Sequence, residues 1–210
     1  MITPYFILLL NYIGIISFSI SGALKAGDKD MDLFGFIVLG YSTALAGGIM
    51  RDLLIGRIPP QNITYLPYQL AAILTAVAMF AIYDRLDRHR DFFLYPDAIG
   101  LGTFAAVGAQ IAMSKGFNIL GVMAMASITA AGGGVVRDLL AAEIPQILRK
   151  EIYATAAAFG GLIYEGLYYL AGTDTALLGT ALIVAGIRIV SLYFGLELPH
   201  IRTRPSRSAQ

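Results

Sequence analysis

The sequence has no cysteine, only two histidines and few charged residues, which make up 14% of its 210 residues. The absence of cysteine excludes disulfides, thiol catalysis and thiolate metal sites. His89 and His200 lie in charged or terminal segments without a second ligand at zinc-site spacing, and we interpret them as solvated loop residues. A formal net charge of +1 provides no basic surface for nucleic acid. We therefore expect no metal, no other cofactor and no nucleic-acid partner.

Hydrophobic residues make up 57% of the chain, and charged residues are far fewer than the quarter or so of an ordinary soluble domain. A membrane-spanning helix takes about 20 residues, so seven spans fit with short connections. The apolar runs predict spans at about 5–24, 33–55, 66–83, 95–113, 118–141, 151–172 and 176–198. The sequence thus predicts an all-α integral membrane protein with seven transmembrane helices in one transmembrane domain, 1–198, followed by a basic cytoplasmic tail, 199–210.

The basic residues are divided unequally between the two sides of such a bundle. With seven spans, the segments 25–32, 84–91 and 149–151 and the tail share one side and hold ten lysines and arginines, whereas the other side has only Arg57 and Lys115. Because lysine and arginine are retained in the cytoplasm, this count predicts an external amino terminus and a cytoplasmic carboxyl terminus. Residues 1–4 lack the basic region of a signal peptide, so we expect the first helix to remain as a span.

An internal repeat appears when the chain is shifted against itself by 86 positions, without any gap. The shift places Arg51-Asp52-Leu53-Leu54 on Arg137-Asp138-Leu139-Leu140 and Gly47-Gly48 on Gly133-Gly134. Repeat 1 covers about 5–83 and repeat 2 about 95–172, three helices each, and the helix at 176–198 stands outside. Copies with an odd number of spans enter the membrane from opposite faces, which is the inverted-repeat plan of many transport proteins. A duplication retained for packing alone is the alternative.

Glycine runs mark corresponding helices of the two copies. Interior glycines weaken a helix, by about 1 kcal/mol each relative to alanine, so we expect kinks or breaks in the pore at Gly47, Gly48, Gly132, Gly133 and Gly134. Carbonyl oxygens released by a break can replace part of a cation's hydration shell. The alternative is that the glycines only allow two helices to cross closely.

An ionisable pair follows each glycine run, Arg51-Asp52 in one copy and Arg137-Asp138 in the other. An arginine inside a span is costly and should not face lipid. Neighbouring residues point about 100° apart on a helix, so we expect each arginine to pair with the aspartate of the other copy or with hydroxyls. The pattern favours a water-filled passage with one charged pair toward each end. Purely structural salt bridges between the copies are the alternative.

Other polar residues of the spans could line such a passage. The candidates are Ser17, Ser21, Lys25, Ser42, Thr43, Thr103, Lys115, Ser127 and Thr129. Single serines and threonines in spans more often bond carbonyls of their own helix. Glu165 and Arg188 are unrepeated charges within spans, which makes them functional candidates and candidates to pair with each other. No serine–histidine pair, aspartate pair or metal-ligand set lies in the spans, so we expect no enzyme.

The motif A/G-G-G-x-x-R-D-L-L at 46–54 and 132–140, set in two inverted repeats plus a seventh helix, resembles the prokaryotic trimeric intracellular cation (TRIC) channels, also grouped as glycine-transporter-domain proteins. The resemblance implies a homotrimer in a prokaryotic inner or plasma membrane, with an hourglass pore for potassium and sodium in each protomer. It assigns the glycine runs to the pore kinks and the Arg-Asp pairs to the pore charges. Ala46 replaces a glycine, so the two constrictions need not be equal. A secondary transporter of a small neutral solute such as glycine is the alternative.

Overall fold

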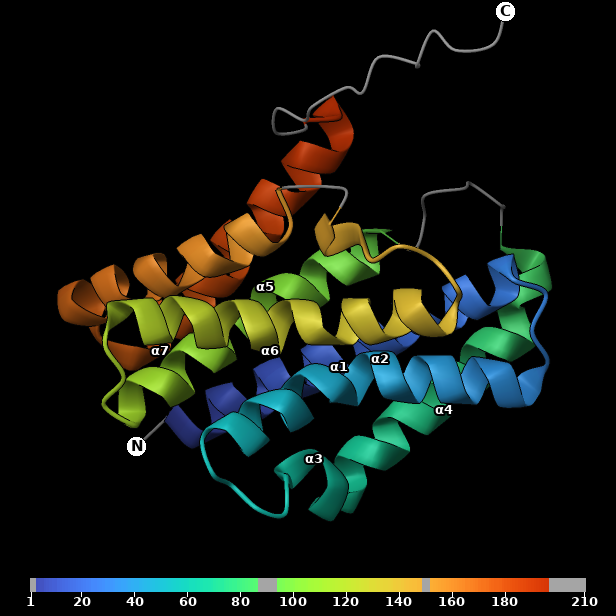
Figure 1. The fold of residues 1–210 in the computed structure, drawn as a ribbon, viewed down its shortest axis with the longest axis horizontal. Helices are drawn as coiled ribbons and strands as arrows, with labels where there is room; N and C mark the ends of the chain where they lie inside the picture. The colour runs from blue at the N-terminus through green and yellow to red at the C-terminus, as the bar shows by residue number, and fades with distance from the viewer. Residues whose placement is uncertain (1–2, 87–93, 149–151, 197–210) are drawn as a thin grey trace, which may run out of the picture.

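The structure, a computed structural model, describes residues 3–86, 94–148 and 152–196, and all of the secondary structure in these ranges is helical (Figure 1). In chain order the elements are α1 Thr3–Asp28, α2 Leu33–Leu54, α3 Gln61–Thr64, α4 Leu66–Ile82, η1 Tyr83–Arg85, α5 Leu94–Ser114, α6 Ile119–Leu140, η2 Gln146–Leu148 and α7 Ala154–Phe194. The predicted tail at 199–210, both histidines and most of the charged run 84–91 lie outside the described residues.

The label α7 covers two helices that meet at Gly172. This residue has φ 81° and ψ 177°, a backbone conformation that only glycine adopts readily. On either side of it, Gly160 faces Val184 and Gly179 faces Leu167, so residues at similar distances before and after Gly172 lie next to each other. The two halves therefore form an antiparallel hairpin, in which the red half returns along the orange one in Figure 1. They correspond to the predicted spans 151–172 and 176–198.

The bundle has the seven long helices that the sequence predicts, once α7 is counted as two. By length and composition, five segments of the described residues are apolar enough to cross a membrane: α1, α2, α4 with η1, α6 and α7. The helix missing from that set is α5, of which 14 of 21 residues are buried. It packs against α1, α6 and α7, so protein rather than lipid surrounds it. A central helix can therefore carry glycines and a buried aspartate that a lipid-facing helix could not.

The two copies of the repeat are inverted relative to each other. The backbone of Gly14 lies against the ring of Phe104, and that of Gly100, 86 positions after Gly14, lies against the ring of Phe18. Phe18 and Phe104 also correspond in the repeat, and their ring centroids are 5.3 Å apart. Such reciprocal contacts require a pseudo-twofold axis between α1 and α5. The axis relates α1, α2 and α4 to α5, α6 and the first half of α7.

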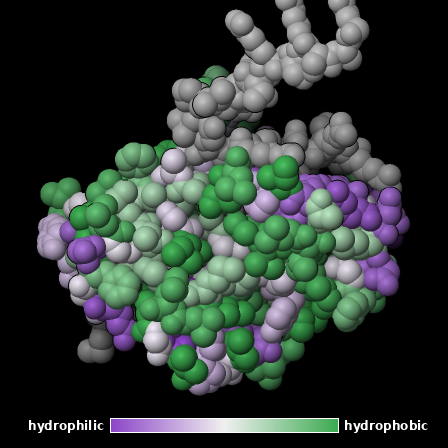
Figure 2. All heavy atoms as spheres, in the orientation of Figure 1, coloured by the Kyte–Doolittle hydropathy of each residue, from purple (hydrophilic) through white to green (hydrophobic). Residues whose placement is uncertain are grey.

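Helix ends repeat with the same spacing. The Asp32 side chain accepts a hydrogen bond of 2.8 Å from the Gly35 N–H at the start of α2, and Asn118 accepts one of 2.9 Å from Gly121 at the start of α6. These caps satisfy backbone donors that have no partner within the helix. Apolar side chains cover much of the surface in Figure 2, with hydrophilic residues gathered toward the helix ends. This distribution suits a bundle surrounded by lipid along its length.

Candidate functional site

The middle of the protomer is a close crossing of α2 and α6, made possible by glycine. A Cβ atom on Gly47 would lie less than 3.0 Å from the carbonyl oxygen of Thr129, and one on Gly133 would lie equally close to the carbonyl oxygen of Thr43. A Cβ on Gly132 would lie 3.1 Å from the Cα of Gly47. The two backbones are therefore in direct contact, and any side chain at these positions would push the helices apart.

The predicted helix breaks at the glycine runs are wrong. Both α2 and α6 continue as regular helix through Gly47–Gly48 and Gly132–Gly134. The physical reason is that the absence of side chains lets α2 and α6 pack backbone against backbone, and this contact compensates for the weak helix propensity of glycine. The carbonyl groups at the crossing therefore belong to intact helices, and the close-crossing interpretation describes the observed role of the glycines.

Each glycine run also makes room for a polar side chain on a helix face other than the one at the α2–α6 crossing. A Cβ on Gly48 would overlap the amide of Asn62, which donates a 3.0 Å hydrogen bond to the Leu45 carbonyl. A Cβ on Gly134 would lie 2.6 Å from the hydroxyl of Tyr153. Asn62 and Tyr153 come from the connections that follow α2 and α6. Glycine thus lets these connections fold back into the bundle.

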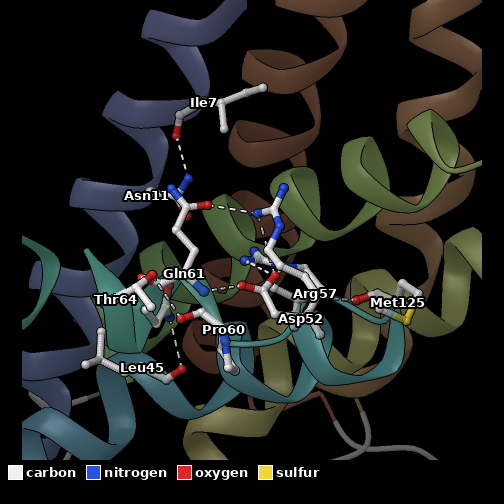
Figure 3. Close-up of polar contacts among 12 residues, drawn as sticks. Ile7, Asn11, Leu45, Asp52, Arg57, Pro60, Gln61, Thr64 and Met125 are labelled. Carbon is white, nitrogen blue, oxygen red and sulfur yellow. Dashed lines mark hydrogen bonds and ion pairs between the residues drawn. The ribbon is translucent and has the colours of Figure 1, made fainter.

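The first charged pair is formed within one copy. The Arg51 Nε donates to Asp52 Oδ1 at 2.9 Å, and both residues are buried. The other oxygen of Asp52 accepts a 2.8 Å hydrogen bond from the backbone N–H of Gln61 at the start of α3, while Arg57 donates to the Gln61 side chain at 2.9 Å (Figure 3). Asp52 therefore ties the end of α2 to the connection that follows it.

The second copy repeats this arrangement and adds to it. Arg137 Nε donates to Asp138 Oδ1 at 2.9 Å, and Asp138 Oδ2 accepts from the backbone N–H of Gln146 at 2.8 Å. The prediction that each arginine pairs with the other copy's aspartate is wrong, because the long guanidinium side chain folds back to the adjacent carboxylate. The expected hydroxyl contact does occur at one site, since Arg137 Nη1 donates to Ser21 Oγ of α1 at 2.7 Å.

Sequence reasoning missed a further carboxylate, Asp97 near the start of α5. It forms a buried ion pair with Arg137 and is 0% exposed. The corresponding position of the first copy, 86 residues earlier, is Asn11, which is also buried and whose amide donates to the Ile7 carbonyl at 2.9 Å. The gap-free register of the repeat could have found both residues, because it aligns two polar residues within apolar runs.

Arg188 of α7 lies beside this second pair rather than beside Glu165. Its guanidinium carbon is 4.9 Å from the centroid of the Tyr153 ring, and its nitrogens donate at 3.3 Å to the Ile152 carbonyl and to the Gln146 side chain. The Arg188 side chain thus reaches residues that precede α7, whereas Glu165 lies 11 positions, or about 17 Å, after the start of that helix. The suggested pairing of Glu165 with Arg188 is therefore wrong.

The remaining candidates have different surroundings. Five hydroxyls donate to carbonyls three or four residues earlier in their own helices: Ser42, Thr43, Thr103, Ser127 and Thr129. Ser17 is buried, and Lys115 is exposed just after α5. Lys25 forms an ion pair of 2.5 Å with Glu143, which links the end of α1 to the segment after α6.

The charged pairs are sealed from solvent in this conformation. Arg51 is 2% exposed and Arg137 is 0% exposed, and the glycine crossing lies along the chain just before each of them. The residues expected to line a passage therefore close the bundle here. The two pairs nevertheless occupy opposite ends of it, as the inversion predicts.

The family comparison follows the two repeats. The family model described as glycine transporter matches residues 8–84 and 94–169. A UPF0126 membrane protein of Deinococcus radiodurans is 40% identical over 195 residues, which cover 90% of this chain and 89% of that protein. The UPF0126 inner membrane protein YadS of Escherichia coli K12 is 36% identical over 194 residues, covering 90% and 93%.

Solved structures with the same fold are TRIC channels, that is, ion channels rather than enzymes. One TRIC cation channel is 45% identical with a TM-score of 0.85, covering 94% of this chain and 98% of the other. A prokaryotic TRIC channel crystallised in 0.5 M KCl is 41% identical with a TM-score of 0.87 (91% and 98%). The Rhodobacter sphaeroides TRIC orthologue is 38% identical with a TM-score of 0.85 (90% and 98%). The chain is therefore a membrane protein that belongs to the prokaryotic TRIC channel family.

Proposed function

We propose that this protein is a channel for monovalent cations, chiefly potassium and sodium, with a hydrated route inside each protomer of a homotrimer. The observation that carries the proposal is the inverted repeat that buries one Arg-Asp pair toward each end of the bundle, on a fold shared at 45% identity with a TRIC cation channel. The proposed location is the inner membrane of a prokaryotic cell, with the amino terminus outside and the carboxyl terminus in the cytoplasm. The excess of basic residues on one side supports this orientation.

A cation route past buried arginines needs compensation of their charge. Two unit charges 4 Å apart repel by about 1 kcal/mol in bulk water and by about 4 kcal/mol at the effective dielectric of a protein surface. Asp52 and Asp138 lie 2.9 Å and 2.8 Å from the arginine nitrogens and cancel most of this repulsion. The pairs therefore allow a cation to pass without an isolated positive charge in its way.

The glycine crossing is the proposed gate. The carbonyl oxygens of Thr43 and Thr129 face Gly133 and Gly47 across the contact. If α2 and α6 separate, these two oxygens turn toward the space that opens, and each keeps a lone pair beyond its helical hydrogen bond. Carbonyl oxygens of this kind can replace part of a cation's hydration shell.

The test is ion selectivity in planar bilayers. With purified protein in a potassium chloride gradient, we expect reversal potentials close to the potassium equilibrium potential, and altered conductance in Arg51→Ala and Arg137→Ala. Reversal near the chloride equilibrium potential would contradict the cation assignment. The transporter alternative predicts saturable glycine uptake without unitary currents. Parallel potassium flux and glycine uptake measurements on the same proteoliposomes distinguish the two.

A further inference from the structure

The two halves of the protomer differ in their buried charges. In the first half the buried pair is Arg51-Asp52, the position equivalent to Asp97 is the neutral Asn11, and the neighbouring basic residue Arg57 has a side chain that is 44% exposed. In the second half the place of Asn11 is taken by Asp97, and Arg188 enters from the unrepeated second half of α7. Apart from Lys25, which pairs with Glu143, the buried charges of each half balance, but the second half has one additional buried charge of each sign.

The second half therefore holds a four-charge cluster, which we define as Arg137, Asp138, Asp97 and Arg188. All four residues are at most 1% exposed. Arg137 contacts both carboxylates, whereas Arg188 is held by neutral groups, the Gln146 amide oxygen and the Ile152 carbonyl. Tyr153 connects the two sides of the cluster, because Arg188 packs on its ring while its hydroxyl, like the Arg137 guanidinium that pairs with Asp97, lies close to Gly134. The first half has no carboxylate at the position of Asp97 and no arginine that corresponds to Arg188. Arg188 therefore supplies the positive charge that compensates for Asp97.

Several buried polar atoms of this region have no hydrogen-bond partner in the part of the chain that the structure describes. Asp97 Oδ2, the Tyr153 hydroxyl and Arg188 Nε are buried and have no hydrogen-bond partner among the described residues. Buried polar atoms without a partner are costly and commonly bind water or an ion. A carboxylate oxygen and a phenol oxygen are both suitable for a monovalent cation. The guanidinium of Arg188, packed on the Tyr153 ring, already supplies a positive charge beside that phenol.

We propose that Arg188 is a tethered counter-ion for Asp97, which takes the place of a permeating cation and sets how strongly the second half of the protomer binds potassium. This inference rests on the proposed channel function. It gives Arg188 a specificity-determining role without a counterpart in the first half. Removing Arg188 leaves the cluster with one net negative charge, removing the charge of Asp97 leaves one net positive charge, and removing both restores neutrality. The double variant also gives the second half the chemistry of the first, because Asp97→Asn places an asparagine at the position equivalent to Asn11.

The first measurement is thermal unfolding of the full-length protein in detergent, which requires no channel activity. We expect Arg188→Gln and Asp97→Asn each to lower the melting temperature by roughly 6–20 °C, because each leaves a buried charge uncompensated. The double variant should recover most of the loss, and Arg188→Lys, which keeps the charge, should lose less than Arg188→Gln. Recovery of expression only in the double variant would be equally supportive. Additive losses in the double variant would overturn the proposal.

The second measurement is single-channel conductance as a function of potassium concentration. Arg188→Gln should lower the half-saturating potassium concentration, Asp97→Asn should reduce cation conductance, and the double variant should return toward wild type. The changes should depend on the direction of the potassium gradient, because only one half is altered. Coupling in stability without any change in these values would make Arg188 a purely structural partner and overturn the proposal. Absence of cation current in the wild type would instead refute the proposed function, while the melting data would still test the pairing.

Discussion

The α2–α6 crossing predicts that alanine at its glycines destabilises the protein, the reverse of the usual effect of alanine in a helix. A Cβ on Gly133 would lie less than 3.0 Å from a backbone carbonyl oxygen, whereas a carbon and a carbonyl oxygen come no closer than about 3.3–3.6 Å in favourable contacts. Neither backbone can move without shifting a whole helix. Such overpacking costs about 1–3 kcal/mol, against a gain of about 1 kcal/mol in helix propensity.

A matched control is available in the same chain. Gly166 lies in the first half of α7, and a Cβ there would meet nothing within 4 Å. Gly166→Ala should therefore raise the free energy of unfolding by up to about 1 kcal/mol, while Gly133→Ala should lower it by up to about 2 kcal/mol. At about 2–4 °C per kcal/mol for a chain of this size, the two variants should differ by about 2–12 °C in melting temperature. Circular dichroism of the purified protein in detergent measures this difference.

The pseudo-twofold axis makes the prediction stricter. Gly47→Ala meets the carbonyl of Thr129 in the same way that Gly133→Ala meets that of Thr43, so the two variants should lose similar stability. If both variants melt at or above the temperature of Gly166→Ala, the helices are not held in contact by their glycines and the reasoning fails.

Two further predictions concern charged groups. Asp52→Asn should destabilise the protein more than Asp138→Asn, because Arg137, the arginine beside Asp138, keeps Asp97 as a second carboxylate. Breaking a buried ion pair costs about 3–5 kcal/mol. Equal losses of stability for the two variants in chemical denaturation would contradict this prediction. Burial raises the pKa of Glu143, but hydrogen bonds from Lys25 in α1 and Lys29 just after it outweigh this effect and hold the pKa below its ordinary value of 4.5. The ionised Glu143 therefore stabilises the folded protein fully above pH 4.5, and this stabilisation is lost as the pH falls through the lowered pKa. The melting temperatures of wild type and Glu143→Gln should converge in acid. A difference in melting temperature that stays constant with pH would refute this prediction.

Hydropathy and repetition predicted the fold because the bilayer fixes the length of each apolar run. The seven helices and their inversion follow from runs and register alone. The reversal at Gly172 was not predicted in form, since one residue replaces the expected short connection between the last two spans. The role of the glycines was also misjudged. A glycine run lowers helix propensity, but whether the helix breaks depends on the neighbouring helix, and a single sequence does not identify that neighbour.

The candidate site was predicted in part. The charges of Arg51 and Arg137 were recognised because charges stand out in apolar spans, but their partners depend on how a flexible side chain folds. Asp97 lies only two residues inside the predicted span 95–113, where a charge stands out less than in the middle of an apolar run. Comparing the copies position by position would have shown it, because the register aligns it with Asn11. Arg188 has no counterpart in the repeat, so only tertiary packing reveals its surroundings.

Contact with the unrepeated second half of α7 decides which substitutions act differently in the two halves. Contacts on the axis, such as those of the paired glycines, are made twice by equivalent residues, and a change at either position perturbs the same crossing. Contacts away from the axis include the second half of α7, which packs on the second copy and carries Arg188. A buried arginine there requires a carboxylate on that side alone, which accounts for Asp97 opposite Asn11. Equal effects at paired glycines together with unequal effects at Asp97 and Asn11 would therefore locate the axis by experiment, and equal effects at both would contradict the packing described.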